Sequence, residues 1–402
     1  MTLFLHLSTM NFVVDDDDIP EDDVIIFSIL YSCVTVVFAM AVLSKFLTNE
    51  FRFGFRSALS LAVLFLGEPL CQFFVKGPLG VGCFAAGCLL IYSILPASHL
   101  PVGNKAVVIT GCDSGFGNAL VKKLDAIGMH VYAGCLDKDG PGAVSLRHTC
   151  SDRMHLLQLD VTKDEDISKA VEIVRLDVGS EGLWGLVNNA GVCYFSELEM
   201  TPEPIMRKMF DVNLFGTVNT TKAFLPLIRQ AKGRIVVVSS VLGRISFEGY
   251  GAYGMAKHAL MAFSDTLRQE MKKWSVNVSI IEPTGYRTGN VAETTLKGRK
   301  EEIWEKLDEN AKATYGLDYL DEIYSSLMEQ CKTFPDDLTP VVRAMRSGLL
   351  SKRPKERYPC GAGADIFTYV MNLLPIWWGD TISLAMSPIP KSSHPAALRN
   401  DQ

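Results

Sequence analysis

A glycine-rich turn between an apolar run and a helical stretch restricts the folds open to this chain more than any other feature. The apolar run covers residues 106–109, and a helical pattern begins near Asn118. Glycines in such a turn let the backbone approach a pyrophosphate, and the N-terminus of the helix supplies donors and partial positive charge. The order strand, turn, helix therefore predicts a dinucleotide site. The expected contacts are Gly111, Asp113, Ser114, Gly115, Phe116 and Gly117.

The chain beyond Lys105 alternates short β-branched runs with helical stretches, a pattern typical of a parallel sheet covered on both faces. We therefore predict an α/β protein with a doubly wound parallel sheet. The expected strands are 106–110, 130–135, 155–159, 185–188, 234–239 and 277–282, with a shorter one near 357–360. Helices are expected between them, for example at 117–127, 164–178 and 252–273.

Residues 24–43 form a stretch of twenty positions without a charged side chain. As a helix it would be about 30 Å long, enough to cross a bilayer. Weaker apolar stretches follow at 57–75, interrupted by Glu68 and Pro69, and at 79–95. We expect N-terminal transmembrane helices, one to three in number, and a re-entrant hairpin is the alternative for the last two stretches.

The charges beside the first stretch predict its orientation. Acidic residues precede it at 15–18 and 21–23, and Lys45, Arg52 and Arg56 follow it. Basic flanks face the cytosol, so either one or three spans would leave the remainder of the chain in the cytosol. A signal peptide is disfavoured because the preceding region is acidic rather than basic.

Three regions follow from these patterns. We expect a membrane anchor over 1–98, a globular domain over 99–387 and an irregular, proline-containing tail over 388–402. Residues 284–339 mix apolar and charged positions at helical spacing, which predicts an amphipathic lid over an apolar pocket for a small lipophilic substrate. Core packing is the alternative for any one of these apolar residues.

Charge and cysteine content exclude other classes of function. The net charge of −6 gives no reason to expect nucleic-acid binding. The ten cysteines show no zinc-ligand spacing, and no metal site is predicted. Unpaired thiols of this kind suit a reducing compartment.

The ends of the next strands supply further candidate cofactor contacts. Asp137 lies just beyond the second strand, where a carboxylate can accept hydrogen bonds from a ribose 2′-hydroxyl and would repel a 2′-phosphate. This position favours NAD over NADP, and a carboxylate in an ordinary turn is the alternative. Asp160 and Val161 follow the third strand and could flank an adenine ring. At the end of the fourth strand, the expected contacts are Asn188, Ala190 and Gly191.

Tyr253 and Lys257 are one helical turn apart on one helix face. The ammonium group, together with a positively charged nicotinamide, is expected to lower the phenol pKa by about two to three, so that Tyr253 exchanges a proton with an alcohol or carbonyl. Ser240 ends the fifth strand and could hold the reacting oxygen, and Asn213 could steady a water molecule. Strand capping, core packing and solvated charge are the alternatives for these residues.

Taken together, these motifs resemble the short-chain dehydrogenase/reductase family over about residues 103–300. The matching features are the Thr-Gly-x-x-x-Gly-x-Gly turn, the Asn-Asn-Ala-Gly segment at 188–191, and the tetrad Asn213, Ser240, Tyr253 and Lys257. The resemblance implies a Rossmann domain that transfers hydride between a nicotinamide cofactor and an alcohol or carbonyl. It also implies cofactor contacts from Tyr253, Lys257, Pro283 and Thr288.

Segments at 100–102, 140–143, 182–184 and 213–218 are similar to the membrane-anchored steroid and retinol branch of that family. The resemblance implies NAD-dependent oxidation of a hydroxysteroid, with a 17β-hydroxyl (estradiol, testosterone) preferred. An 11β-hydroxyl of a glucocorticoid or retinol is the alternative, and a catalytically silent nucleotide-binding protein is the alternative from another class. It further implies an endoplasmic reticulum membrane location and pairing into a homodimer.

One departure from the family pattern affects the cofactor site. The family usually has Pro-Gly after the sixth strand, whereas this chain has Pro283-Thr284-Gly285. We expect Thr284 to be accommodated if its φ is negative.

Overall fold

The protein is described from a computed structural model that covers residues 21–48, 55–75, 77–94 and 99–399. The chain divides into two compact units, one within residues 1–99 and the other within 100–402. Acidic residues 15–18 and Arg52 lie outside the described residues. All ten cysteines lie in the described part of the chain and are free thiols.

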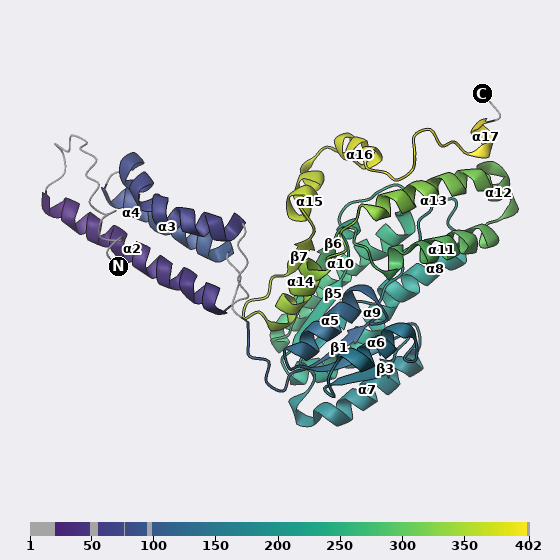
Figure 1. The fold of residues 1–402 in the computed structure, drawn as a ribbon, viewed down its shortest axis with the longest axis horizontal. Helices are drawn as coiled ribbons and strands as arrows, with labels where there is room; N and C mark the ends of the chain where they lie inside the picture. Colours follow the sequence, from purple (N-terminus) through teal and green to yellow (C-terminus); the bar gives the residue numbers. More distant parts are fainter. Residues whose placement is uncertain (1–20, 49–54, 76, 95–98, 400–402) are drawn as a thin grey trace. The chain divides into compact units, whose positions relative to one another are not determined.

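The described residues of the first unit form three helices, α2 (Glu21–Thr48), α3 (Phe55–Phe74) and α4 (Gly77–Ile94) (Figure 1). Tyr31 and Phe38 of α2 pack with Phe84 of α4 in a small apolar cluster. Within the described residues, one segment, Ile25–Leu43, is long and apolar enough to cross a membrane, and the apolar parts of α3 and α4 are shorter. The number of spans therefore stays a prediction.

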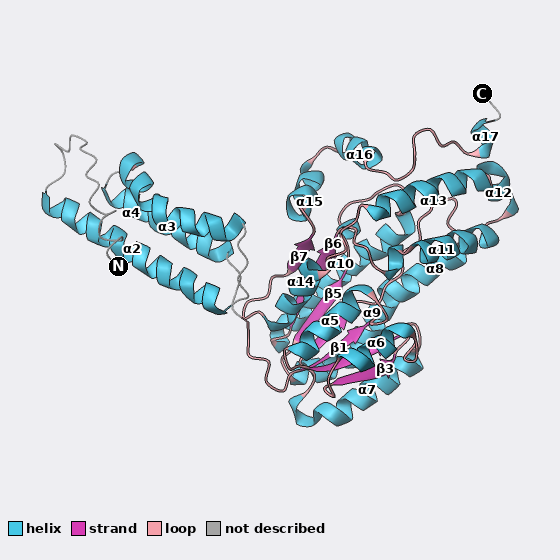
Figure 2. Ribbon diagram, viewed as in Figure 1, coloured by secondary structure: helices cyan, strands magenta, loops and turns pink. Residues whose placement is uncertain are grey.

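The second unit is built on a parallel sheet, as Figure 2 shows, with seven strands in its described part in the order β3-β2-β1-β4-β5-β6-β7. The doubly wound α/β prediction is confirmed. The strands are β1 Ala106–Thr110, β2 His130–Cys135, β3 Met154–Gln158, β4 Gly185–Asn188, β5 Arg234–Val238, β6 Asn277–Pro283 and β7 Arg357–Cys360. Four strands have the predicted bounds. The ends of β3, β5 and β6 differ from prediction by one residue.

Helices cover both faces of this sheet because alternate side chains of each strand point to opposite faces. Val107 and Ile109 pack toward one set of helices, and Ala106 and Val108 pack toward the other. The first set is α5 Gly115–Ala126, α6 Pro141–Thr149 and α14 Thr339–Leu350. The second set is α7 Asp164–Val178, α9 Thr217–Gln230 and α10 Gly251–Met271.

The predicted lid consists of three helices that pack on the loop after β4 and on α8 (Glu203–Phe210). They are α11 Glu293–Lys306, α12 Glu309–Tyr315 and α13 Leu317–Lys332. Ile303 and Leu320 are fully buried in this cluster, so the core-packing alternative holds for them. Tyr253 is packed against the same cluster, which places the lid beside the predicted site.

The C-terminal region contains α15 (Ala364–Leu373), α16 (Ile376–Ala385) and α17 (Ala396–Arg399). The tail after residue 387 was predicted to be irregular. It is not wholly irregular, because residues 396–399 form one helical turn.

Short elements also occur in the second unit: the 3₁₀ turns η1 Gly179–Glu181, η3 Val241–Gly243, η4 Lys272–Trp274 and η5 Gly289–Val291, and the π-helical segment η2 Asp211–Gly216.

Candidate active site

The glycine turn joins β1 to α5 in a space that excludes larger residues. Gly111 and Gly115 adopt φ values of +69° and +58°, which L-residues with side chains rarely adopt. A Cβ added at Gly117 would lie 2.4 Å from the Gly111 carbonyl oxygen, and one added at Gly111 would lie 2.7 Å from the Ala190 Cα. Among the described residues, no side chain caps the first amides of α5. The cradle therefore fits a pyrophosphate.

Asp113 connects this turn to the loop that follows β2. Its carboxylate accepts hydrogen bonds from the backbone amides of Leu136 (3.0 Å) and Asp137 (3.1 Å). The Asp137 side chain is exposed and accepts a hydrogen bond from the amide of Asp139. Asp113 thus holds in place the loop that carries the predicted ribose acceptor, a role that sequence reasoning did not assign to it.

The predicted adenine contacts lie at the end of β3. The Asp160 carboxylate accepts two hydrogen bonds from Thr162, from its amide (3.0 Å) and its hydroxyl (2.7 Å). Val161 is buried, and a Cβ added at Gly216 would lie 2.6 Å from its Cγ2. Val161 therefore packs on the helical segment after α8, and Asp160 remains half-buried at the sheet edge.

The Asn188–Gly191 segment packs under the glycine turn. Asn188 is buried and donates a hydrogen bond to the Thr221 hydroxyl of α9 (2.9 Å), so its side chain points into the sheet–helix interface. Asn189 donates to the carbonyls of both Thr110 and Gly111 (2.9 Å each). Sequence reasoning did not select Asn189 as a site residue, although it belongs to the same Asn-Asn-Ala-Gly segment.

Asn213 lies in η2, where the continuous helix widens between α8 and α9. Its side chain is fully buried, and its amide group exchanges two hydrogen bonds of 2.8 Å with the backbone of Val192. A Cβ added at Gly191 would lie 3.1 Å from the Asn213 Oδ1 and 3.8 Å from the Lys257 Nζ. Asn213 and Lys257 therefore both lie beside Gly191, and the role of Asn213 in steadying a water molecule stays a prediction.

Ser240 and Tyr253 meet where β5 ends and α10 begins. The Ser240 Oγ accepts the amide of Leu242 (3.1 Å) and contacts the carbonyl of Pro283 (3.4 Å). It therefore also caps η3, the short turn that follows β5. Burial raises the pKa of Tyr253, whereas a hydrogen bond with Ser240 acts in the opposite direction.

Lys257 is buried on α10, one turn after Tyr253. Its Nζ donates to the carbonyl oxygen of Val238 (3.0 Å) and lies 5.5 Å from the centre of the Tyr253 ring. Burial lowers the Lys257 pKa to about 8. Without cofactor, desolvation outweighs the nearby charge of Arg299 and keeps the Tyr253 pKa above its usual value. The decrease that also requires the nicotinamide charge stays a prediction.

Residues 105–298 match the family described as short chain dehydrogenase. The chain is also 37% identical to 11-beta-hydroxysteroid dehydrogenase type 2 of Ovis aries over 88% of this chain and 83% of that protein. The chain belongs to the short-chain dehydrogenase family.

Other relatives of this short-chain dehydrogenase have different substrates in their names. Estradiol 17-beta-dehydrogenase 2 of Mus musculus is 41% identical over 76% of this chain and 79% of that protein. The mitochondrial D-beta-hydroxybutyrate dehydrogenase of Bos taurus is 43% identical over 68% of this chain and 84% of that protein. A short-chain dehydrogenase structure from Streptomyces avermitilis aligns with a TM-score of 0.53 and 27% identity, over 67% of this chain and 93% of that chain.

The departure at Thr284 is accommodated in this short-chain dehydrogenase. Thr284 does not adopt a positive φ, and its amide donates to the carbonyl of Cys360 (2.9 Å), which continues the pairing of β6 with β7. Pro283 ends β6 beside Ser240. Thr288 packs over the glycine turn, since a Cβ added at Gly115 would lie 3.2 Å from the Thr288 Cβ.

Two residues of the lid segment that sequence reasoning missed, Asn290 and Arg299, form hydrogen bonds to the loop after β4. Arg299 of α11 donates to the carbonyls of Cys193 (2.6 Å) and Asn290 (2.8 Å) and to the Asn290 side chain (2.7 Å). Asn290 in turn donates to the Gly191 carbonyl (3.1 Å). Nothing in the sequence distinguishes Arg299 from the other charged residues of the lid.

Proposed function

We propose that this short-chain dehydrogenase oxidises a 17β-hydroxysteroid, such as estradiol or testosterone, to the 17-ketosteroid with NAD. The observation that carries the proposal is the convergence of Ser240, Tyr253 and Lys257 beside a glycine cradle at the carboxyl ends of the parallel strands. That edge of the sheet is where doubly wound folds bind ligands. The similarity to estradiol 17-beta-dehydrogenase 2 supports the choice of substrate.

In this proposal Tyr253 accepts the proton of the substrate hydroxyl, and Ser240 donates a hydrogen bond to the same oxygen. Because burial raises the Tyr253 pKa, forming the phenolate depends on nearby positive charge. Lys257 lies beside the ring, and the charge of Arg299 also favours the phenolate. Asn213 supports proton exchange from Lys257 toward solvent. NAD, when bound, supplies the hydride acceptor.

The turn residues 111–117 would hold the pyrophosphate, and Asp137 would accept the ribose hydroxyls. The exposed carboxylate of Asp137 would repel a 2′-phosphate, which supports NAD rather than NADP. Asp160, Val161 and the backbone of 188–191 would contact the adenosine half. Pro283 and Thr288 would contact the nicotinamide half.

We further propose a location in the endoplasmic reticulum membrane with the catalytic unit in the cytosol. Ile25–Leu43 would anchor the chain, and the basic residues that follow it would remain on the cytosolic side. A lipophilic steroid partitions into the same bilayer, so anchoring would raise its concentration near the enzyme. A homodimer is part of this proposal by analogy with the family.

The decisive test uses membranes that contain the full chain. They are assayed with NAD and a panel of estradiol, testosterone, cortisol, retinol and D-3-hydroxybutyrate. Oxidation of estradiol or testosterone with the highest kcat/KM supports the proposal. Preference for cortisol or for retinol would establish the corresponding alternative. The similarity to 11-beta-hydroxysteroid dehydrogenase type 2 favours the first of these alternatives. No NAD-dependent oxidation of any panel member contradicts the proposed activity.

A further inference from the structure

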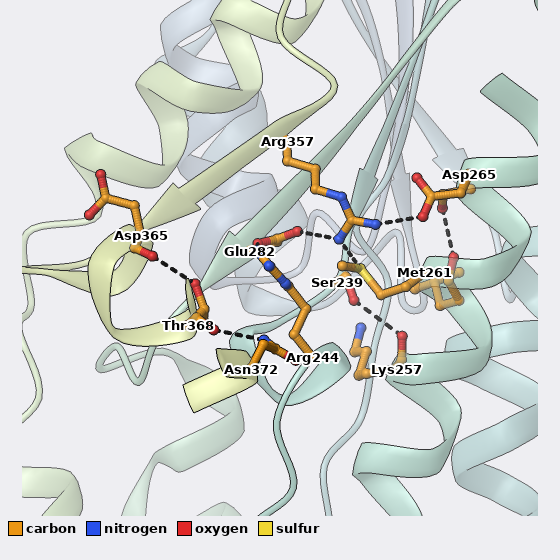
Figure 3. A network of polar contacts seen from close by, with 12 residues as sticks. Ser239, Arg244, Lys257, Met261, Asp265, Glu282, Arg357, Asp365, Thr368 and Asn372 are labelled. Atoms are coloured by element: carbon orange, nitrogen blue, oxygen red, sulfur yellow. Dashed lines mark hydrogen bonds and ion pairs between the residues drawn. The ribbon is translucent and has the colours of Figure 1, made fainter. Parts of the chain in front are cut away.

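A buried carboxylate lies directly behind the proposed catalytic groups. Glu282 is the penultimate residue of β6, it is 0% exposed, and it immediately precedes Pro283. Its Oε1 accepts a hydrogen bond from the Arg357 Nη1 (2.9 Å), and its Oε2 lies 3.5 Å from the Arg244 Nη1. Figure 3 shows both guanidinium groups beside this carboxylate. Burial of a carboxylate is costly without such partners.

The two arginines extend the contact to other elements. Arg357 of β7 also donates to the Asp265 carboxylate of α10 (2.5 Å) and contacts the sulfur of Met261 in the same helix (3.9 Å). Arg244 follows η3 and stacks over the Tyr369 ring of α15 at 5.1 Å. Asp265 also pairs with Arg268 of α10 (3.3 Å), so three guanidinium groups surround the two carboxylates of this network.

Three parts of the chain in this network, β6, the η3 turn and α10, carry residues of the proposed site. The residue after Glu282 is Pro283, whose carbonyl contacts the Ser240 hydroxyl. Arg244 is four residues beyond Ser240, at the end of the turn that Ser240 caps. Asp265 is two helical turns beyond Lys257 on α10, the helix that also carries Tyr253. Glu282 therefore connects the Ser240 turn to β6 through Arg244, and to α10 through Arg357.

The turn and the helix are in close contact, so small displacements are transmitted between them. A Cβ added at Gly243 would lie 2.8 Å from the Met261 Cγ and 3.0 Å from the Lys257 carbonyl oxygen. Ser239 also donates to the Lys257 carbonyl (3.4 Å), as Figure 3 shows. Loss of the charge that fixes Arg244 would thus change where Ser240 lies relative to Tyr253.

We infer that Glu282 is a positioning residue for the reaction: through Arg244 and Arg357 it sets the placement of the Ser240 turn against the helix that carries Tyr253 and Lys257. The inference rests on the dehydrogenase activity proposed above and adds a residue to it. Glu282 does not reach the substrate. Its effect should therefore appear in kcat, because a displacement of about 1 Å in a catalytic group can cost about 100-fold in rate.

The test compares Glu282→Gln with Asp125→Asn in the full chain. Asp125 is a matched control, since it is 6% exposed, lies 3.9 Å from Arg153 and accepts hydrogen bonds from Ser151, but lies at the end of α5 away from the catalytic strand ends. Both variants lose one buried negative charge, and both should unfold at a lower temperature. We expect kcat to fall at least 10-fold in Glu282→Gln only, with the KM for NAD unchanged.

Arg244→Gln is the second variant, and it keeps the test decisive if Glu282→Gln does not fold. It should lower kcat similarly, and the double variant should lower kcat no further than either single change. If Glu282→Gln is destabilised but retains the kcat of the control, or if Arg244→Gln retains it, the positioning role is refuted. An inactive parent protein would instead refute the proposed function, so the two failures are distinguishable.

Discussion

The Nζ of Lys257 donates a 3.0 Å hydrogen bond to the carbonyl oxygen of Val238, the last residue of β5. This contact attaches the lysine side chain to the end of the sheet, while the same side chain lies beside the ring of Tyr253. A buried ammonium with a single carbonyl partner is poorly solvated, which explains why burial lowers its pKa to about 8. Helix α10 therefore contains a group that lowers the stability of the folded protein.

Tyr253→Phe should abolish turnover while leaving NAD binding nearly unchanged. The substitution removes the only atom of Tyr253 that can take the substrate proton and keeps the ring that packs against the lid. Turnover with steroid and the Kd for NAD are the two measurements. Turnover of the variant at the parent rate would exclude Tyr253 from the mechanism.

Lys257→Met should abolish turnover and stabilise the protein. A pKa of about 8 instead of 10.5 corresponds to about 3 kcal/mol of unfavourable charge burial near pH 7, and the lost hydrogen bond offsets about 1 kcal/mol. The penalty is complete below pH 8, where both states hold the proton. It decreases from pH 8 to 10.5, because only the unfolded chain holds the proton in that range, and it is absent above pH 10.5, where both states have lost it. Denaturant unfolding measures the free energy of unfolding of the variant and of the parent protein. The excess stability of the variant should be smaller at pH 10 than at pH 7.

Asn213→Ala should destabilise the protein by about 1–3 kcal/mol, since it leaves the amide and carbonyl of Val192 without their partner in a buried site. Turnover should also decrease, because Asn213 lies near Lys257. Asn219→Ala, at an exposed position of α9, is the control and should change stability by less than about 0.5 kcal/mol. Equal stability of the two variants would contradict this account of η2.

Asp137→Asn should raise the ratio of kcat/KM for NADP over NAD by about 10-fold, because the substitution removes repulsion of a 2′-phosphate worth about 1.4 kcal/mol. Asp139→Asn is the neighbouring control, since Asp139 is also exposed but pairs with Arg147 (3.1 Å). An unchanged cofactor ratio in Asp137→Asn, or the same change in both variants, would count against Asp137 as the ribose acceptor.

Arg299→Leu should loosen the lid without unfolding the sheet. The change removes three hydrogen bonds that join α11 to Asn290 and to the loop at Cys193. We expect a several-fold higher KM for the steroid, with the KM for NAD less affected. Substrate kinetics with both ligands varied would test this, and an unchanged steroid KM would show that Arg299 only stabilises the lid.

Local sequence patterns determined the fold and the proximity of the main site residues. Strand bounds followed from runs of β-branched residues, and Tyr253 and Lys257 share a helix face because the α-helix repeats every 3.6 residues. The glycines of the turn could be assigned from their spacing. Gly111 shows why the spacing is restrictive, because its backbone has a positive φ and contacts Ala190, so no other residue fits there. These rules act over a few positions, so the sequence is sufficient to apply them.

Tertiary packing determined the pKa values and the long-range side-chain contacts, which local sequence patterns do not predict. Without cofactor the pKa of Tyr253 is raised, because packing of the lid on the rest of the unit removes the phenol from water. Asp113, Arg299 and Glu282 acquire their roles from partners that are 9 to 106 residues away in the chain. Such ion pairs and hydrogen bonds depend on which strands are neighbours and where helices lie on them, and desolvation depends on everything that surrounds a group. The sequence therefore determined which chemistry is present, and the tertiary structure determined the electrostatic environment in which that chemistry operates.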